Sequence, residues 1–243
     1  MDAPRKVVAM SGGKDSTCLA LALQEHEPGA YEYVGNFTGN ELPALAEHLV
    51  NLERLLGTSI RRIGAGIDLY QLIDQMKMIP NFRARFCTRV LKIEPMIAYM
   101  STLPAGSILY VGLRADEAMR VGIYGEEFPI RFPLREWGWG VNEVMGYLDK
   151  RGVQIPARTD CGMCFYQRLG EWWELWKSHP EEFARGVEVE NRIGHTFRSA
   201  RRDTWPASLA ELAKEFERGH IPRGAELQLN LFGGTEKCRV CSL

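Results

Sequence analysis

The chain has 243 residues, 45% of them hydrophobic and 25% charged, with a formal net charge of −1. This composition is typical of a globular protein with a substantial core. The near-neutral charge excludes a general attraction to nucleic acid, so a role with nucleic acid would need a local basic patch. No apolar run approaches the roughly 20 residues that span a bilayer, and the first ten residues lack the apolar stretch of a signal peptide. We therefore expect a cytoplasmic protein that makes no membrane contact.

The first half of the chain alternates β-prone runs with helix-forming stretches. Strands are predicted at residues 6–10 (KVVAM), 31–37, 59–63 and 107–112 (SILYVG). Helices are predicted from residue 16 to about 24 and over 43–56, where apolar residues recur every three to four positions. This order predicts an α/β fold with an open, mostly parallel sheet and helices on both faces.

Polar segments follow three of the predicted strands. They are SGGKDS (11–16), TGNE (38–41) and LRADE (113–117). Because ligands of such sheets bind outside the carboxyl ends of the strands, we expect these segments to form one site. The character of the chain changes after about residue 160, where Trp and Cys become frequent and helical, charged stretches follow. We predict a nucleotide-binding domain over residues 1–158 and a helical C-terminal region over 159–243.

The segment SGGKDS is suited to binding phosphate groups. Glycines permit a tight turn, hydroxyls and helix N-terminal N–H groups donate hydrogen bonds, and a lysine adds a cation. The candidate residues are Ser11, Gly12, Gly13, Lys14, Asp15 and Ser16. Asp15 is predicted to cap the helix, orient Lys14 or hold Mg²⁺. The spacing differs from GxxxxGK[ST], so this is not a Walker-type loop.

SGGKDS resembles the pyrophosphate loop of the N-type ATP pyrophosphatases, which split ATP between its α and β phosphates and adenylate an oxygen. Five further segments occur in the order seen in the phosphoadenosine-phosphosulfate (PAPS) reductase-like group: FTGNE (37–41), RFCTRVLKIEP (85–95), VGLRADEAMR (111–120), FPLREWGW (132–139) and DCGMCFYQRLGEWWEL (160–175). RFCTRVLKIEP is most similar to the ATP pyrophosphatases of DNA phosphorothioation systems and to related phage and bacterial proteins. The resemblance covers about residues 6–180 and implies an adenine nucleotide alpha hydrolase-like fold.

The resemblance also implies roles for individual residues. Beside the loop, the implied nucleotide-binding residues are Thr38, Gly39, Arg114, Glu117 and Arg120. The implied catalytic residues are Lys14, Asp15, Arg89, Lys92 and Arg114. Arginine and lysine side chains suit phosphate oxygens, and carboxylates among them can orient the arginines or bind Mg²⁺ that bridges the phosphates of ATP. Arg135 is left open between a surface charge and a site residue.

Four cysteines form two CxxC pairs, Cys161 with Cys164 and Cys238 with Cys241. Two such pairs indicate a four-thiolate metal site, with Zn²⁺ the simplest occupant. The resemblance adds Cys87, at a position where iron–sulfur members of the reductase group hold a [4Fe-4S] cluster with a downstream CxxC. Three arrangements stay open: the two CxxC pairs on one metal or cluster, Cys87 and the first pair with a tail ligand, or a cluster with an open fourth position. Cys18 is predicted to be a packing residue.

We therefore expect an ATP pyrophosphatase that adenylates an acceptor for sulfur incorporation. The resemblance implies a DNA phosphate as acceptor and a cysteine desulfurase as the partner that supplies sulfur. Two alternatives remain, a sulfonucleotide reductase that attacks sulfur with Cys238 or Cys241, and a nucleotide-binding scaffold with structural zinc.

Overall fold

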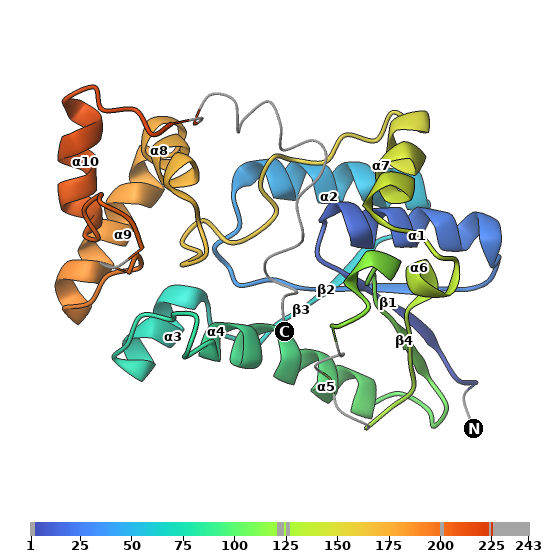
Figure 1. Ribbon diagram of the computed structural model, residues 1–243. Helices are drawn as coiled ribbons and strands as arrows, with labels where there is room; N and C mark the ends of the chain where they lie inside the picture. The colour runs from blue at the N-terminus through green and yellow to red at the C-terminus, as the bar shows by residue number, and fades with distance from the viewer. Residues whose placement is uncertain (1–2, 121–123, 125–126, 200–201, 224, 226–243) are drawn as a thin grey trace.

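The computed structural model describes residues 3–120, 124, 127–199, 202–223 and 225 (Figure 1). Cys238 and Cys241, predicted as metal ligands, lie outside the described residues. Within the described part of the chain, no helix combines the length and apolar character needed to cross a bilayer.

A five-stranded sheet forms the centre of the molecule, with strand order β3-β2-β1-β4-β5 and parallel pairing throughout. The strands are β1 (Lys6–Met10), β2 (Glu32–Asn36), β3 (Ile60–Ile63), β4 (Ile108–Tyr110) and β5 (Ile130–Arg131). The predicted fold class is confirmed, and the first four strands lie where the sequence predicted them. β5 was missed because its two residues are too short to show a β pattern.

Helices cover both faces of the sheet because successive strand residues point to opposite sides. Val8 and Met10 pack with buried leucines of α1 (Lys14–His26), α2 (Pro43–Leu56) and α7 (Val141–Lys150). Val7 and the buried residues beside it on β2 and β4 pack instead against two methionines of α5 (Glu94–Ser101). Cys18 is fully buried in the first of these clusters, which confirms its packing role.

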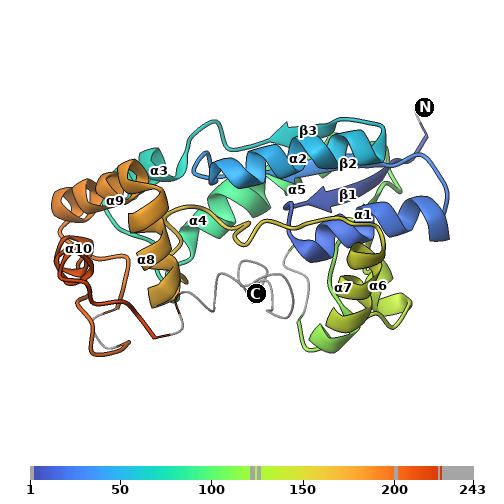
Figure 2. The same ribbon diagram turned by 90° about the horizontal axis from the view of Figure 1, so that it is seen from above.

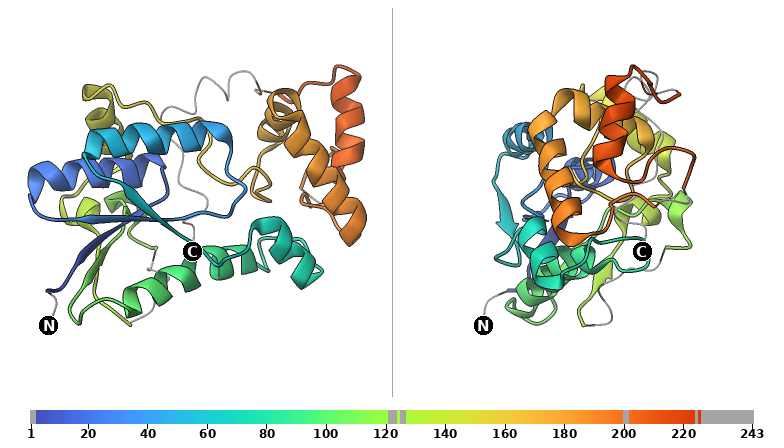
Figure 3. Two further views of the ribbon diagram at one scale, coloured as in Figure 1. Left: turned by 180° about the vertical axis from the view of Figure 1, so that it is seen from behind. Right: turned by 90° about the vertical axis from the view of Figure 1, so that its left-hand side faces the viewer.

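A third hydrophobic cluster lies beyond the carboxyl ends of the strands (Figure 2). It joins α3 (Leu69–Met76) and α4 (Phe86–Thr88) to α8 (Leu169–Ser178), α9 (Pro180–Ile193) and α10 (Leu209–Glu217). Apolar packing therefore crosses residue 158, the predicted domain boundary, and the division into a domain over residues 1–158 and a C-terminal region over 159–243 stays a prediction. Figure 3 shows the same helices beyond the end of the sheet from two further sides.

The strand order positions the site. The chain first builds β1, β2 and β3 outward in one direction and then returns to place β4 on the other side of β1. In open parallel sheets this reversal leaves a crevice between the loops that follow the two central strands. Here those loops are the segment after β1, which contains SGGKDS, and the segment after β4, which contains LRADE.

Candidate nucleotide site and thiol pocket

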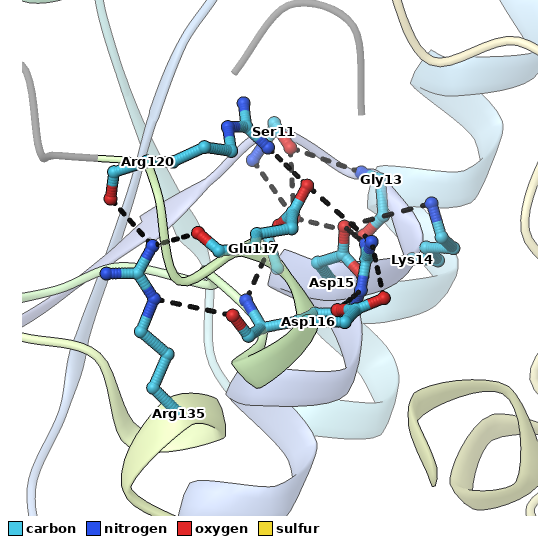
Figure 4. Close-up of polar contacts among 10 residues, drawn as sticks. Ser11, Gly13, Lys14, Asp15, Asp116, Glu117, Arg120 and Arg135 are labelled. Carbon is cyan, nitrogen blue, oxygen red and sulfur yellow. Dashed lines mark hydrogen bonds and ion pairs between the residues drawn. The ribbon is translucent and has the colours of Figure 1, made fainter. Parts of the chain in front are cut away.

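The loop between β1 and α1 is held by its own hydroxyl groups (Figure 4). The Ser16 hydroxyl donates to the carbonyl oxygen of Gly13 at 3.1 Å and accepts from the Ser11 backbone N–H at 3.3 Å. The Gly13 N–H in turn donates to the Ser11 hydroxyl oxygen at 3.3 Å. These bonds keep the loop tight at the start of α1, where the helix dipole favours an anion.

Gly12 is required by both its backbone and its surroundings. Its φ is +74°, in the left-handed region that side chains disfavour. A Cβ at this position would lie 2.4 Å from Cδ1 of Leu45 and 3.3 Å from Cδ2 of Leu49, both buried on α2. The loop therefore packs directly on α2, and its shape depends on the absence of a side chain at Gly12.

A buried ion pair connects this loop to the segment after β4. Nη1 of Arg114 lies 2.7 Å from Oδ2 of Asp15, and both side chains are nearly fully buried. Nζ of Lys14 lies 3.8 Å from the same oxygen. Burial raises the pKa of Asp15 despite these two cations. Among the described residues, Oδ1 of Asp15 has no hydrogen-bond partner although it is buried, so this oxygen is available to a further ligand.

Arg114 also binds the carboxylates of the 3₁₀ turn η2 (Ala115–Glu117). Its Nε lies 2.9 Å from Oδ1 of Asp116, and its Nη2 lies 3.5 Å from Oε1 of Glu117, which also pairs with Arg120. Burial opposes the charge on Arg114, but these carboxylates and Asp15 raise its pKa and keep it a cation. The structure thus brings Lys14, Asp15, Arg114, Glu117 and Arg120 together as the sequence predicted.

Arg135 holds this turn in place, a role that the sequence left open. Its Nη2 donates to the carbonyl oxygens of Glu117 at 2.6 Å and Arg120 at 2.7 Å, and its Nε donates to that of Arg114 at 3.3 Å (Figure 4). The available sequence signal was the segment FPLREW, in which Arg135 lies on the short helix α6 (Pro133–Glu136) that follows β5. Because β5 was not predicted, nothing in the sequence placed Arg135 at the carboxyl edge of the sheet.

Replacing Arg135 with lysine should loosen the turn that presents Arg114. A lysine keeps the charge but cannot reproduce the planar fork that reaches three carbonyl oxygens. We expect the affinity for ATP to fall about tenfold and the free energy of unfolding to fall by about 1–3 kcal/mol, measured by equilibrium binding and urea denaturation. The control is Arg151→Lys, since Arg151 pairs with Glu25 on a different surface. An unchanged ATP affinity in Arg135→Lys would contradict a positioning role.

The loop after β2 holds the first CxxC segment. The backbone N–H of Thr38 and its hydroxyl donate to Oε1 of Glu41 at 2.6 and 2.8 Å, and Glu41 forms a β-bridge with Cys161. The backbone carbonyl oxygen of Asn40 accepts a hydrogen bond from the Gly162 N–H at 2.6 Å, and its side-chain Oδ1 accepts one from the Met163 N–H at 2.9 Å. Thr38 and Gly39, predicted to bind nucleotide, therefore lie in the loop that positions the cysteines. The sequence did not predict that Asn40 holds the CxxC segment, although Asn40 belongs to the quoted segment TGNE.

Three cysteines line one pocket together with two cations. Cys87, Cys161 and Cys164 share this pocket with Arg85 and Lys92. A hydrogen bond with Cys164 and then burial raise the pKa of Cys161 well above its usual range, and burial raises that of Cys87. The thiols of Cys87 and Cys161 are therefore protonated at neutral pH in this state, and ligation of a metal would have to displace their protons.

The donor set suits a thiolate-bound metal or cluster by its chemistry, since three thiols line one pocket. Among the residues that the structure describes, however, no group of three Cys, His, Asp or Glu is arranged to hold a metal ion. A complete site would need a further ligand and a closer approach of the three thiols.

Arg89 differs from Lys92, although both were predicted to be catalytic. Both lie on the π-helix η1 (Arg89–Ile93), but only Lys92 lines the thiol pocket. The Arg89 side chain is 61% exposed and its Nη1 lies 2.5 Å from Oε1 of Glu94. The catalytic assignment of both residues stays a prediction.

Comparisons with solved structures give likenesses at low sequence identity. No protein-family model matches the sequence, and no curated protein matches it. Similar solved structures include a PAPS reductase from Candida auris as a phosphate complex, at 12% identity and TM-score 0.49, over 63% of this chain and 75% of that one. An NH₃-dependent NAD synthetase from Campylobacter jejuni is similar at 13% identity and TM-score 0.45, over 92% and 90% of the two chains.

A U34-tRNA thiolase from Methanococcus maripaludis, solved with its [4Fe-4S] cluster, is similar at 15% identity and TM-score 0.46, over 99% of this chain and 80% of that one. At these identities the likenesses do not bear on what this chain binds or transforms. The fold assignment above rests on the strand order and pairing of this chain.

Proposed function

We propose that this chain is an ATP pyrophosphatase of the PAPS reductase-like group that activates an acceptor for sulfur incorporation. One observation carries the proposal: a phosphate-type loop after β1, an arginine turn after β4 and a three-thiol pocket beside the loop after β2 lie at one edge of one parallel sheet. Phosphate chemistry and sulfur chemistry can therefore act on one substrate.

The phosphate loop and its partners would bind ATP. The N–H groups at the start of α1 and Lys14 would bind phosphate oxygens, and Arg114 would neutralise charge that develops on the leaving pyrophosphate. Oδ1 of Asp15, buried without a described partner, fits a ligand of the Mg²⁺ that accompanies ATP. An acceptor oxygen attacks the α-phosphorus, pyrophosphate leaves, and a sulfur nucleophile then displaces AMP together with that oxygen.

The thiol pocket would hold the sulfur-handling group. Cys87, Cys161 and Cys164, with Cys238 or Cys241, would ligate a [4Fe-4S] cluster or Zn²⁺. A cluster supplies iron that can bind sulfide, whereas zinc would stabilise the fold. Burial raises the pKa of Cys87, and the hydrogen bond with Cys164 raises that of Cys161; the nearby Lys92 offsets only part of each shift, so metal ligation would have to displace these protons. We further propose a DNA phosphate as the acceptor and a cysteine desulfurase as the sulfur donor.

The test is the product of ATP turnover by the full chain, purified without oxygen and assayed with Mg²⁺. We expect AMP and pyrophosphate, with turnover reduced at least tenfold in Ser16→Ala, which removes loop bonds to Ser11 and Gly13. Iron, sulfide and zinc analysis of the same sample identifies the bound group. Release of ADP and phosphate would contradict the proposal, and thiol-dependent sulfite release from PAPS would support the reductase instead.

A further inference from the structure

The segment that carries Cys87 is unusually basic. Residues 77–93 contain five Lys or Arg and no Asp or Glu, whereas the whole chain contains 30 basic and 31 acidic residues. The segment is therefore locally basic in a chain with almost no net charge. Such a region attracts polyanions even when the net charge does not.

An exposed aromatic ring lies on this basic segment. Phe82 is 60% exposed, and Cζ of Arg83 lies 5.7 Å from the centre of its ring. The turn that presents it is firmly held, since Asn81 and Ala84 exchange two backbone hydrogen bonds at 3.1 and 3.2 Å. The Asn81 side chain also accepts the N–H of Arg83 at 3.0 Å. A large apolar ring is thus held in solvent beside a guanidinium group.

A second arginine–aromatic pair connects this turn to the thiol pocket. Cζ of Arg85 lies 5.2 Å from the ring centre of Tyr166, whose ring lies 4.4 Å from that of Phe165. Arg85, Tyr166 and Phe165 all line the pocket that contains the three cysteines, as does Pro80, two residues before Phe82. The segment therefore contributes one arginine–aromatic pair on its exposed turn and one arginine, paired with Tyr166, to the lining of the thiol pocket.

We propose that residues 77–93 bind single-stranded nucleic acid, with one base stacked on Phe82 and neighbouring phosphates on Arg83 and Arg89. Aromatic rings stack on any base, and guanidinium groups bind phosphate oxygens, so the segment offers both contacts that an unpaired strand needs. A base can stack on a ring at the tip of a turn only when it lies outside a duplex. The ion pair of Arg89 with Glu94 must be shared or opened on binding.

This inference rests on the proposed function, because the surface would bring an acceptor strand to the thiol pocket. Binding of the strand itself requires no ATP. The test is fluorescence anisotropy of the full chain with a labelled 20-nucleotide oligothymidine, without ATP, over a series of salt concentrations. We expect Phe82→Ala to weaken binding about tenfold and Phe82→Trp to restore it. We expect Arg83→Ala to reduce the slope of log affinity against log salt by about 0.7.

Two control variants distinguish a loss of this surface from the general effect of removing an exposed apolar or basic side chain. Leu55→Ala removes another exposed apolar side chain, 54% exposed on α2, and Arg218→Ala removes an exposed, ion-paired arginine directly after α10. Both should bind the oligonucleotide as the unchanged chain does. Binding that is insensitive to Phe82→Ala and Arg83→Ala, or equal affinity for duplex and single strand, would overturn the inference. Because ATP turnover is measured separately, AMP formation without oligonucleotide binding would reject this surface and leave the pyrophosphatase proposal standing.

Discussion

Replacing Arg114 with alanine should lower the free energy of unfolding by about 3–5 kcal/mol, the usual cost of removing one partner from a buried ion pair. The Arg114 side chain is 1% exposed, and its loss leaves the buried carboxylates of Asp15 and Glu117 without their shared cation. The measurement is urea denaturation monitored by circular dichroism. ATP binding should be lost as well, because the same guanidinium group faces the phosphate loop.

A double-variant cycle identifies the cause. Asp15→Asn in the Arg114→Ala background should recover part of the lost stability, because it removes one of the two buried carboxylates that Arg114 had paired with. Arg192→Ala is the matched control: Arg192 is 49% exposed and its Nη2 lies 2.8 Å from Oδ1 of Asp74, so its loss should cost about 1 kcal/mol or less. Equal losses in Arg114→Ala and Arg192→Ala would show that the buried network does not stabilise the fold.

Replacing Gly12 with alanine should abolish ATP turnover to AMP and lower the free energy of unfolding by about 2–4 kcal/mol. Roughly 1 kcal/mol comes from a side chain at positive φ, and roughly 1–3 kcal/mol from displacing the buried Leu45. ATP turnover should fall by a larger factor than the folding equilibrium changes. The loop can relieve the clash with Leu45 only by moving away from α2, and the N–H groups at the start of α1 would then no longer point at a phosphate group.

Gly57→Ala is a control that introduces a side chain at positive φ without a steric clash. Gly57 ends α2 with a φ of +69°, and nothing lies within 4 Å of where its Cβ would stand. Gly57→Ala should therefore cost about 1 kcal/mol and leave ATP turnover unchanged. If Gly12→Ala turns over ATP like Gly57→Ala, then the loop does not bind the phosphates of ATP in the proposed way.

Much of this protein follows from local patterns in its sequence. β-prone runs of five to seven residues predicted four strands, and the polar segments that follow two of them indicated where the SGGKDS loop and the Arg114 turn would lie. These predictions succeed because they depend on short-range properties: side-chain periodicity, the permissive backbone of glycine, and the rule that parallel strands present their carboxyl ends at one edge.

Other features depend on contacts between distant segments. The nucleotide-binding role of Thr38 and Gly39 stays a prediction, but the sequence did not show that the loop containing them forms a β-bridge through Glu41 with Cys161, 120 positions away. Arg135 binds carbonyl oxygens 15 to 21 positions earlier in the chain. Cys87 and Cys161 meet because α3, α4 and the C-terminal helices share one apolar cluster. No local pattern encodes such pairings, because backbone carbonyl groups are alike in every residue, and which of them a side chain reaches is decided when the elements pack together.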